Sequence, residues 1–279
     1  MTRFPPNLLR RTSGPPRIST GGSDVYRDVT DTTQSVAIHA GAELEDALRQ
    51  QQLVVHYQGI FPLQPRGPEG SEALLRWDHP TRGLLVPADF LPEDMGSTVG
   101  SMLTNFVLED AAARAAGWQR AGLRRGVSVN IAPNRLSDEV FPAYVAALLR
   151  RHRLDPRRLT IEVTEARFGS DLRSLARPLA TLARMGVRLS LDDFGTGESS
   201  LVRLQHLHFD ELKIDRAFVS NSDNNPTDRH IVRFAANLAH SLGMTVVAEG
   251  IETQACLELM TRIGLDAGQG FHLQAPGRH

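Results

Sequence analysis

The chain has 279 residues, of which 41% are hydrophobic and 23% are charged, and its formal net charge is −1. This length suffices for one large α/β barrel or two smaller domains, and the balanced charge gives no reason to expect a nucleic acid polymer as a partner. A single cysteine, Cys256, excludes an intrachain disulfide and a metal site built on thiolates, and we expect it to be buried. No transmembrane-length apolar run or signal-peptide core occurs, which predicts a cytoplasmic protein without membrane insertion.

The pattern along the chain changes near residue 40. Residues 1–40 are rich in Pro, Gly, Ser, Thr and charge and lack hydrophobic periodicity, which predicts a flexible leader before a folded domain at residues 41–279. The expected elements, in chain order, are a helix at 42–52, strands at 53–63 and 71–77, a helix at 101–118, a strand at 127–131, a helix at 141–152, a strand at 159–165, a helix at 171–186, a strand at 187–193, a helix at 199–206, a strand at 211–216, a helix at 228–243, a strand at 245–250, a helix at 253–264 and a strand at 267–273.

Strands that are mostly separated by helices favour a (β/α) barrel in the α/β class, with an open doubly wound sheet as the alternative. Polar residues near the C-terminal ends of these strands would then meet at one mouth of the barrel. They are Asn130, Glu162, Glu165, Asp192, Asp193, Lys213, Asp215, Glu249 and Gln269. Glu72 and Arg76 lie four residues apart on a strand and therefore share a face. For any one of these acids, a solvated position in a loop is the simpler interpretation.

Convergence of the acids would demand a cation. Several carboxylates within a few ångström repel one another, and oxygen ligands without Cys or His suit Mg²⁺ or Mn²⁺ rather than Zn²⁺. The residues concerned are Glu72, Asn130, Glu162, Asp192, Asp193 and Glu249. Lys213 would neutralise a phosphoryl oxygen or hold a water, or else form a structural ion pair with Asp215 or another acid. These residues by themselves also allow some other Mg²⁺-dependent barrel enzyme that acts on a phosphorylated metabolite.

The stretch DDFGTGESS at residues 192–200 joins an expected strand to an expected helix. Ser200 stands where a dinucleotide-binding loop would have its third glycine, and the two aspartates would repel a phosphate. We therefore interpret Gly195 and Gly197 as residues that let the loop turn and position the acids.

Seven ordered motifs resemble a known family. SEALLRW, VSVNI, IEVTE, DDFGTG, LKIDRAFV, VVAEGIET and AGQGF follow the order and approximate spacing of EAL-domain cyclic-di-GMP phosphodiesterases over about residues 42–276. The resemblance implies a modified triosephosphate isomerase barrel with an antiparallel first strand. It also implies hydrolysis of cyclic di-GMP to linear pGpG in bacterial second-messenger signalling, with two Mg²⁺ or Mn²⁺ ions.

The resemblance implies a role for each polar position. The implied metal ligands are Glu72, Asn130, Glu162, Asp192 and Asp193. The implied catalytic residues are Lys213 beside the attacking water, Glu249 as general base or second-metal ligand, and Glu165 as a brace of the DFGTG loop. Gln58, Arg76, Asp215 and Gln269 match positions near the substrate or the catalytic network.

The sequence departs from the family pattern at three places. Glu198 replaces the usual aromatic residue, residues 90–96 are two residues shorter, with Glu93 or Asp94 as substitutes for paired acids, and the sequence ends at LQAPGRH without the family's closing helix. We expect the missing helix to lower stability. Because of Glu198 and the shortened 90–96 stretch, a non-catalytic module that binds cyclic di-GMP or a protein is the alternative to an enzyme. The resemblance also implies a homodimer or a regulatory protein as a partner.

Overall fold

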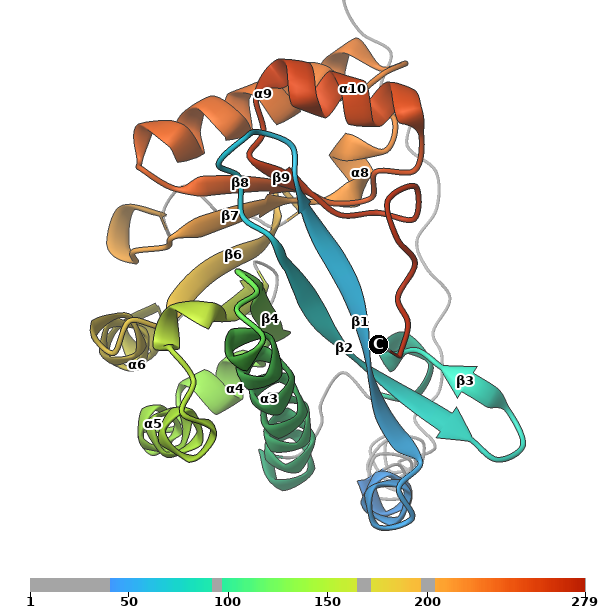
Figure 1. The fold of residues 1–279 in the computed structure, drawn as a ribbon, viewed down its shortest axis with the longest axis vertical. Helices are drawn as coiled ribbons and strands as arrows, with labels where there is room; N and C mark the ends of the chain where they lie inside the picture. Colours follow the sequence, from blue (N-terminus) through green and yellow to red (C-terminus); the bar gives the residue numbers. More distant parts are fainter. Residues whose placement is uncertain (1–40, 92–96, 165–171, 197–203, 279) are drawn as a thin grey trace, which may run out of the picture.

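The structure is a computed structural model that describes residues 41–91, 97–164, 172–196 and 204–278 (Figure 1). The predicted leader at residues 1–40 lies outside the described residues, as do Glu93, Asp94, Glu198 and most of the helix expected at 199–206.

Eight strands of the described residues close into a barrel. In chain order they are β1 (Leu53–Pro62), β2 (Gly70–His79), β4 (Gly126–Asn130), β5 (Leu159–Thr164), β6 (Arg188–Phe194), β7 (Glu211–Ile214), β8 (Thr245–Ala248) and β9 (Ala267–Gly268). The order around the sheet is β1-β9-β8-β7-β6-β5-β4-β2, and the β1–β2 pairing closes it. Strand β1 runs antiparallel to β2 and β9, whereas the remaining barrel pairs are parallel. The predicted barrel with an antiparallel first strand is confirmed, and the open-sheet alternative is wrong.

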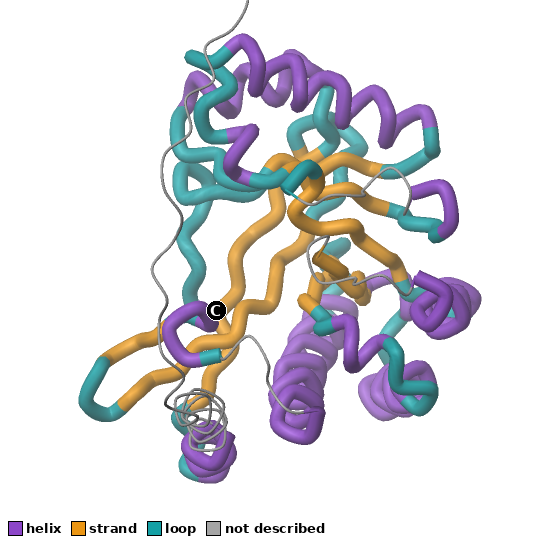
Figure 2. The backbone as a smooth tube through the Cα atoms, turned by 180° about the vertical axis from the view of Figure 1, so that it is seen from behind, coloured by secondary structure: helices purple, strands orange, loops and turns teal. Residues whose placement is uncertain are grey.

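The helices surround the strands (Figures 1 and 2). The longer ones are α3 (Ser97–Arg120), α5 (Phe141–His152), α6 (Leu172–Arg184), α9 (Pro226–Ser241) and α10 (Gln254–Ile263), and residues 41–49 are also helical. Figure 1 shows α3, α5 and α6 on one side of the barrel and α9 and α10 on the other. Short elements missed in the sequence are β3 (Gly83–Leu85), which forms a hairpin with β2, and α2 (Pro87–Phe90), α4 (Pro133–Leu136), η1 (Pro156–Arg158) and α8 (Arg216–Val219).

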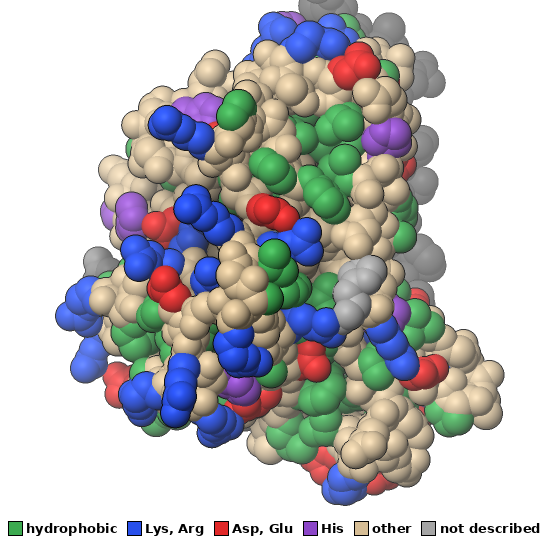
Figure 3. Space-filling view, viewed as in Figure 1, with side chains coloured by type: hydrophobic (Ala, Val, Ile, Leu, Met, Phe, Trp, Pro, Cys, Tyr) green, Lys and Arg blue, Asp and Glu red, His purple; other side chains and the backbone are tan. Residues whose placement is uncertain are grey.

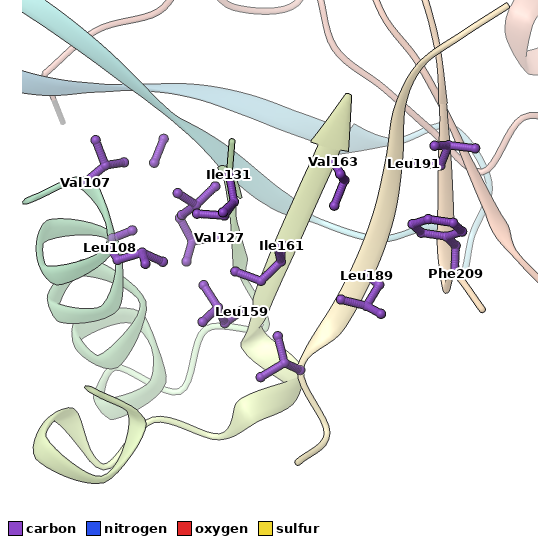
Figure 4. Packing of buried hydrophobic residues seen from close by; sticks show 14 of the residues in the cluster. Val107, Leu108, Val127, Ile131, Leu159, Ile161, Val163, Leu189, Leu191 and Phe209 are labelled. Carbon is purple, nitrogen blue, oxygen red and sulfur yellow. The ribbon is translucent and has the colours of Figure 1, made fainter. Parts of the chain in front are cut away.

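Side chains along each strand point alternately toward the helices and toward the barrel interior. In β5, Leu159 and Ile161 belong to the main hydrophobic core. Figure 4 shows them on the side of the strand that faces α3, the helix to which Leu108 belongs. Thr160 and Glu162 point to the opposite face because successive side chains of a strand alternate. The helices therefore cover the apolar face, and polar side chains are left for the interior.

The barrel interior has two different walls. Ile60, Val247 and Ala267 form a small apolar cluster separate from the main core, on the neighbouring strands β1, β8 and β9. The strands β4 to β7 instead contribute buried polar residues, which we call the polar wall: Ser128, Thr160, Ser190 and Glu211. A barrel interior is ordinarily filled by branched apolar side chains, so the polar wall is a feature that needs an explanation.

The end of the chain differs from the prediction. Strand β9 has two residues rather than seven, because the chain turns after it: the backbone nitrogens of Leu273 and Gln274 donate to the Gly270 carbonyl oxygen at 3.0 and 2.9 Å. The last described residues then run along β1, where the backbones of Tyr57 and Gly277 exchange hydrogen bonds of 2.8 and 3.0 Å. Arg278 adds a hydrogen bond of 2.8 Å to Asp78. Strand-like pairing thus covers the edge of β1 that the short β9 leaves open.

Cys256 is fully buried, burial raises the pKa of its thiol to about 11, and Sγ donates to the Val219 carbonyl oxygen, as expected for a cysteine that serves packing. Within the described ranges, no helix is long and apolar enough to span a bilayer.

Candidate active site

The chain's only lysine lies at the centre of the barrel mouth. Lys213 is fully buried on β7, and all 30 other residues of the 31 Lys and Arg in the sequence are arginines. Its Nζ lies 2.6 Å from Glu249, 3.1 Å from Glu162, 3.2 Å from Glu72 and 3.4 Å from Asp192. We call these four carboxylates the acidic ring. Lys213 is therefore in contact with four of the acids that the sequence pattern predicted to converge.

Three amide side chains brace the acidic ring. Asn130 Nδ2 donates to Glu72 Oε1 at 2.8 Å and to Glu162 Oε2 at 3.1 Å. Gln269 Nε2 donates to the other Glu72 oxygen at 2.6 Å and to Gln58 Oε1 at 3.0 Å. Both glutamines are buried, so in this arrangement they fix the position of Glu72.

The acidic ring carries more negative charge than Lys213 can balance. Burial, followed by the neighbouring carboxylates, raises the pKa of Glu162 and of Glu249 well above the ordinary range, although Lys213 opposes the shift. Burial disfavours the charged form of Lys213, but the four carboxylates outweigh it and hold its pKa well above the ordinary value. Four carboxylates around one ammonium leave a net charge of about −3 when all are ionised, which is costly in a buried site.

A bulge in β6 brings two consecutive acids to one place. The pairing with β7 shifts between Leu191 and Phe194, and Asp193 adopts a left-handed φ of 57°. In a regular strand, adjacent side chains would point to opposite faces, whereas an extra residue redirects one of them. Carboxylate oxygens of Asp192, Asp193 and Glu249 consequently lie within 4.8 Å of one another. Burial and the charge of Asp192 raise the pKa of Asp193 to about 7.

This donor set fits a hard divalent cation. Its donors are carboxylate and amide oxygens, which are the ligands that Mg²⁺ and Mn²⁺ prefer. Glu162 Oε1 and Asp192 Oδ1 are buried and accept no hydrogen bond among the described residues, although both lie within ion-pair distance of Lys213. The group formed by Asp192, Asp193 and Glu249 is the part of the site where three carboxylates can share one ion.

Other predicted site residues lie around the acidic ring. Arg76 is buried on β2, where Nη1 donates to the Leu75 carbonyl oxygen at 2.8 Å; burial lowers its pKa and Glu72 opposes this. Asp215 caps α8 by accepting a hydrogen bond of 2.8 Å from Ala217 N, which also explains why β7 ends at Ile214 instead of residue 216. Glu165 lies outside the described residues.

The turn after β6 requires glycine. Gly195 has a φ of 100°, and a Cβ at this position would lie 2.8 Å from Cε2 of Phe218 in α8. A side chain would therefore meet both backbone strain and a clash. This supports the interpretation that Gly195 positions the acids, whereas Gly197 lies outside the described residues.

Two features of the site went unnoticed in the sequence. The uniqueness of Lys213 is a signal that counting residues reveals directly. Glu211, two residues before Lys213 on β7, faces the same interior because of the period of two, and its charge contributes to the raised pKa of Glu162.

Comparisons with known proteins identify the family and the fold. The family model of the EAL domain matches residues 42–276. The chain is 39% identical over 236 residues to the bifunctional diguanylate cyclase/cyclic di-GMP phosphodiesterase MucR of Pseudomonas aeruginosa, which covers 84% of this chain and 34% of that protein. Its fold is similar to the PaMucR phosphodiesterase in complex with c-di-GMP, with a TM-score of 0.79, 38% identity and coverage of 85% of this chain and 97% of that chain.

A second solved structure is similar over much of the chain. The EAL enzyme Bd1971, in its cAMP- and cyclic-di-GMP-bound form, gives a TM-score of 0.81 at 27% identity, with 90% of this chain and 69% of that chain covered. The chain spans less than half the length of the first curated relatives that it matches.

Proposed function

Because the chain belongs to the EAL domain family and is related to cyclic di-GMP phosphodiesterases, we propose that it hydrolyses cyclic di-GMP to linear pGpG. The observation that carries this proposal is the acidic ring closed around the buried Lys213 at the mouth of the barrel. Clustered oxygen ligands and one ammonium suit the charge that develops on a phosphoryl group during hydrolysis.

The predicted metal ligands can hold Mg²⁺ or Mn²⁺ at this mouth. They are Glu72, Asn130, Glu162, Asp192 and Asp193, with Glu249 as a further carboxylate within reach of the last two. Bound divalent cations would neutralise negative charge on the phosphate and lower the pKa of a water. The net negative charge of the acidic ring, and the lack of a hydrogen bond to Glu162 Oε1 and Asp192 Oδ1 from the described residues, support this assignment.

The chain's own residues position the reacting groups. Lys213 Nζ can donate to the attacking water or to a phosphoryl oxygen, and Glu249, 2.6 Å from it and partly exposed, can accept the proton of that water. As the bond from the water oxygen to phosphorus forms, the bond from phosphorus to the ribose 3′ oxygen breaks, and the leaving oxygen takes a proton from solvent. Gln58, Arg76, Asp215 and Gln269 contact the substrate or hold the catalytic groups in this scheme, and Glu165 braces the DFGTG loop.

The test is product formation. Purified protein is incubated with cyclic di-GMP and saturating Mn²⁺ or Mg²⁺, and pGpG is quantified by chromatography. We expect Glu72→Ala to abolish turnover, Ca²⁺ to inhibit it, and Glu258→Ala, which removes an exposed carboxylate on α10, to leave it unchanged. An unchanged rate in Glu72→Ala would contradict the proposal.

The same ring favours a second candidate, a module that binds cyclic di-GMP without cleaving it. Lys213 lies within ion-pair distance of all four carboxylates of the acidic ring, which offsets part of their charge in the absence of a metal ion. Saturable binding of cyclic di-GMP in Mn²⁺ without any pGpG would support this candidate over the enzyme.

A further inference from the structure

A second pocket lies at the opposite end of the barrel from the acidic ring. It has a volume of about 260 Å³ and opens between the N-terminal ends of β2, β4, β5, β6 and β7. Its lining includes two carboxylates, Glu69 and Glu211, and five arginines, which are Arg124, Arg125, Arg157, Arg158 and Arg188. We call it the arginine pocket.

The surface around this end of the molecule is rich in arginine. Figure 3 shows basic side chains gathered over the part of the molecule that holds α3, α5, α6 and β6 in Figure 1. Because the single lysine is buried, these basic side chains are arginines. Their combined field attracts anions toward the pocket opening.

Two of the five pocket arginines are paired with the pocket's own acids. Arg125 Nε donates to Glu69 Oε1 at 2.7 Å. Arg188 Nη2 lies 3.6 Å from Glu211 Oε2 and donates to Thr245 Oγ1 at 3.0 Å. These contacts account for both carboxylates of the lining.

The other three arginines leave positive charge for a ligand. Arg158 Nη1 donates to the carbonyl oxygens of Leu123 and Arg125, at 2.6 and 3.1 Å, and such bonds neutralise no charge. Arg157 contacts Asp155 at 3.3 Å in an exposed ion pair, which is weak in water. Arg124 is exposed and makes no hydrogen bond or ion pair within the described part of the chain.

The inner end of the pocket is lined by hydroxyl and carboxylate groups instead of arginines. Ser128, Thr160 and Glu211 of the polar wall are buried there. Glu211 Oε1 is buried and accepts no hydrogen bond from the described residues. Burying a carboxylate oxygen without a hydrogen bond lowers the stability of the folded protein. A ligand's hydroxyl or amino group could donate a hydrogen bond to this oxygen. Ligand binding would then explain why polar side chains are buried in this wall of the barrel.

We propose that the arginine pocket binds a small phosphate ester that carries hydroxyl groups, with the phosphate between the rim arginines and a hydroxyl donating to Glu211. Guanidinium groups bind phosphate oxygens in a planar, paired geometry, and the pocket volume suits a ligand of sugar-phosphate size. Inorganic phosphate can contact the rim arginines in the same way, but it has no sugar hydroxyl group to donate to Glu211.

Binding is measured by isothermal titration calorimetry in EDTA with inorganic phosphate, ribose 5-phosphate and unphosphorylated ribose as the probes. Without divalent cations the acidic ring repels phosphate, so the heat of binding measures binding at the arginine pocket. This measurement does not depend on whether the protein hydrolyses cyclic di-GMP. We expect ribose 5-phosphate to bind more tightly than phosphate and ribose not to bind.

A double variant and a matched control locate the site. Arg124→Gln combined with Arg157→Gln should weaken ribose 5-phosphate binding by about tenfold or more, because two charged donors are lost. Arg233→Gln, which removes an exposed arginine on α9 that has no hydrogen bond or ion pair to the described residues, should leave it unchanged. The proposal is overturned if the wild-type chain binds neither phosphorylated probe, if the double variant binds like wild type, or if the control loses as much.

Discussion

The two ends of the barrel have opposite charge and opposite burial. At the mouth, four carboxylates surround one fully buried lysine, whereas five arginines and two carboxylates line the arginine pocket at the other end. The same strands supply both ends: β6 carries Asp192 and Arg188, and β7 carries Lys213 and Glu211. Residues two or four apart on a strand share the interior face, so short segments build two chemically different sites.

Burial decides which end is energetically sensitive. Lys213, Glu72, Glu162 and Asp192 are buried and Glu249 is only partly exposed, so each charge of the acidic ring interacts strongly with its neighbours. Arg124 and Arg157 are exposed, and water and salt screen their charges. We therefore expect large effects from substitutions at the mouth and small effects on folding at the arginine pocket.

The largest effect is expected for Lys213→Met in metal-free protein. Removing the ammonium leaves four carboxylates, three of them buried, without a cation in the ring, which should lower the free energy of unfolding by about 3–5 kcal/mol. Urea denaturation measures this loss, and added Mn²⁺ should recover part of it by supplying positive charge. A loss below about 1 kcal/mol would remove the contrast between the two ends.

A pair of glycines at the two ends sharpens the comparison. Gly195 near the mouth and Gly122 after α3 both have positive φ, but only at Gly195 would a Cβ meet a neighbour within 4 Å, the ring of Phe218. Gly195→Ala should cost about 2 kcal/mol and reduce turnover, whereas Gly122→Ala should cost about 1 kcal/mol from backbone strain alone. Thermal unfolding of both variants gives the difference, and equal losses would show that the contact with Phe218 is unimportant.

Glu162→Gln should separate stability from activity. The amide keeps an oxygen for Asn130 and removes one negative charge from a ring that carries too many, so metal-free protein should gain about 1 kcal/mol. Turnover of cyclic di-GMP should fall by about 100-fold or more because a proposed metal ligand is lost. Glu258→Gln on the exposed face of α10 serves as the control for both measurements, and a destabilised Glu162→Gln would contradict the excess of charge.

The smallest effect is expected for Glu69→Gln at the arginine pocket. Its ion pair with Arg125 is half-exposed on both sides, so the free energy of unfolding should change by less than about 1 kcal/mol and the change should shrink further in high salt. Denaturation at low and high ionic strength tests this. A loss comparable to that of Lys213→Met would mean that burial does not distinguish the two ends.

Several elements were predictable because their signals are local. The helix at 141–152 has the predicted bounds, and strands β1, β4 and β5 begin or end within one residue of prediction, since hydrophobic periodicity and terminal Gly or Pro act over a few residues. AGQGFHL looks locally extended and predicts a strand of seven residues, whereas a turn in which His272 N donates to the Ile251 carbonyl oxygen at 3.1 Å follows the two residues of β9. That contact joins two distant segments only after folding.

The sequence by itself determined the alternation of strands and helices, the family resemblance and the identity of the acids that converge, because residue type and spacing specify which side chains share a face of a strand. Only the tertiary structure decided that Lys213 contacts four of those acids at once, and that a bulge turns Asp193 toward Asp192 and Glu249. It also decided that arginines from three separate segments meet at the end of the barrel opposite the acidic ring. The physical reason is closure: the stagger and tilt of the strands, which no local pattern encodes, set which strand positions lie at the same level of the barrel.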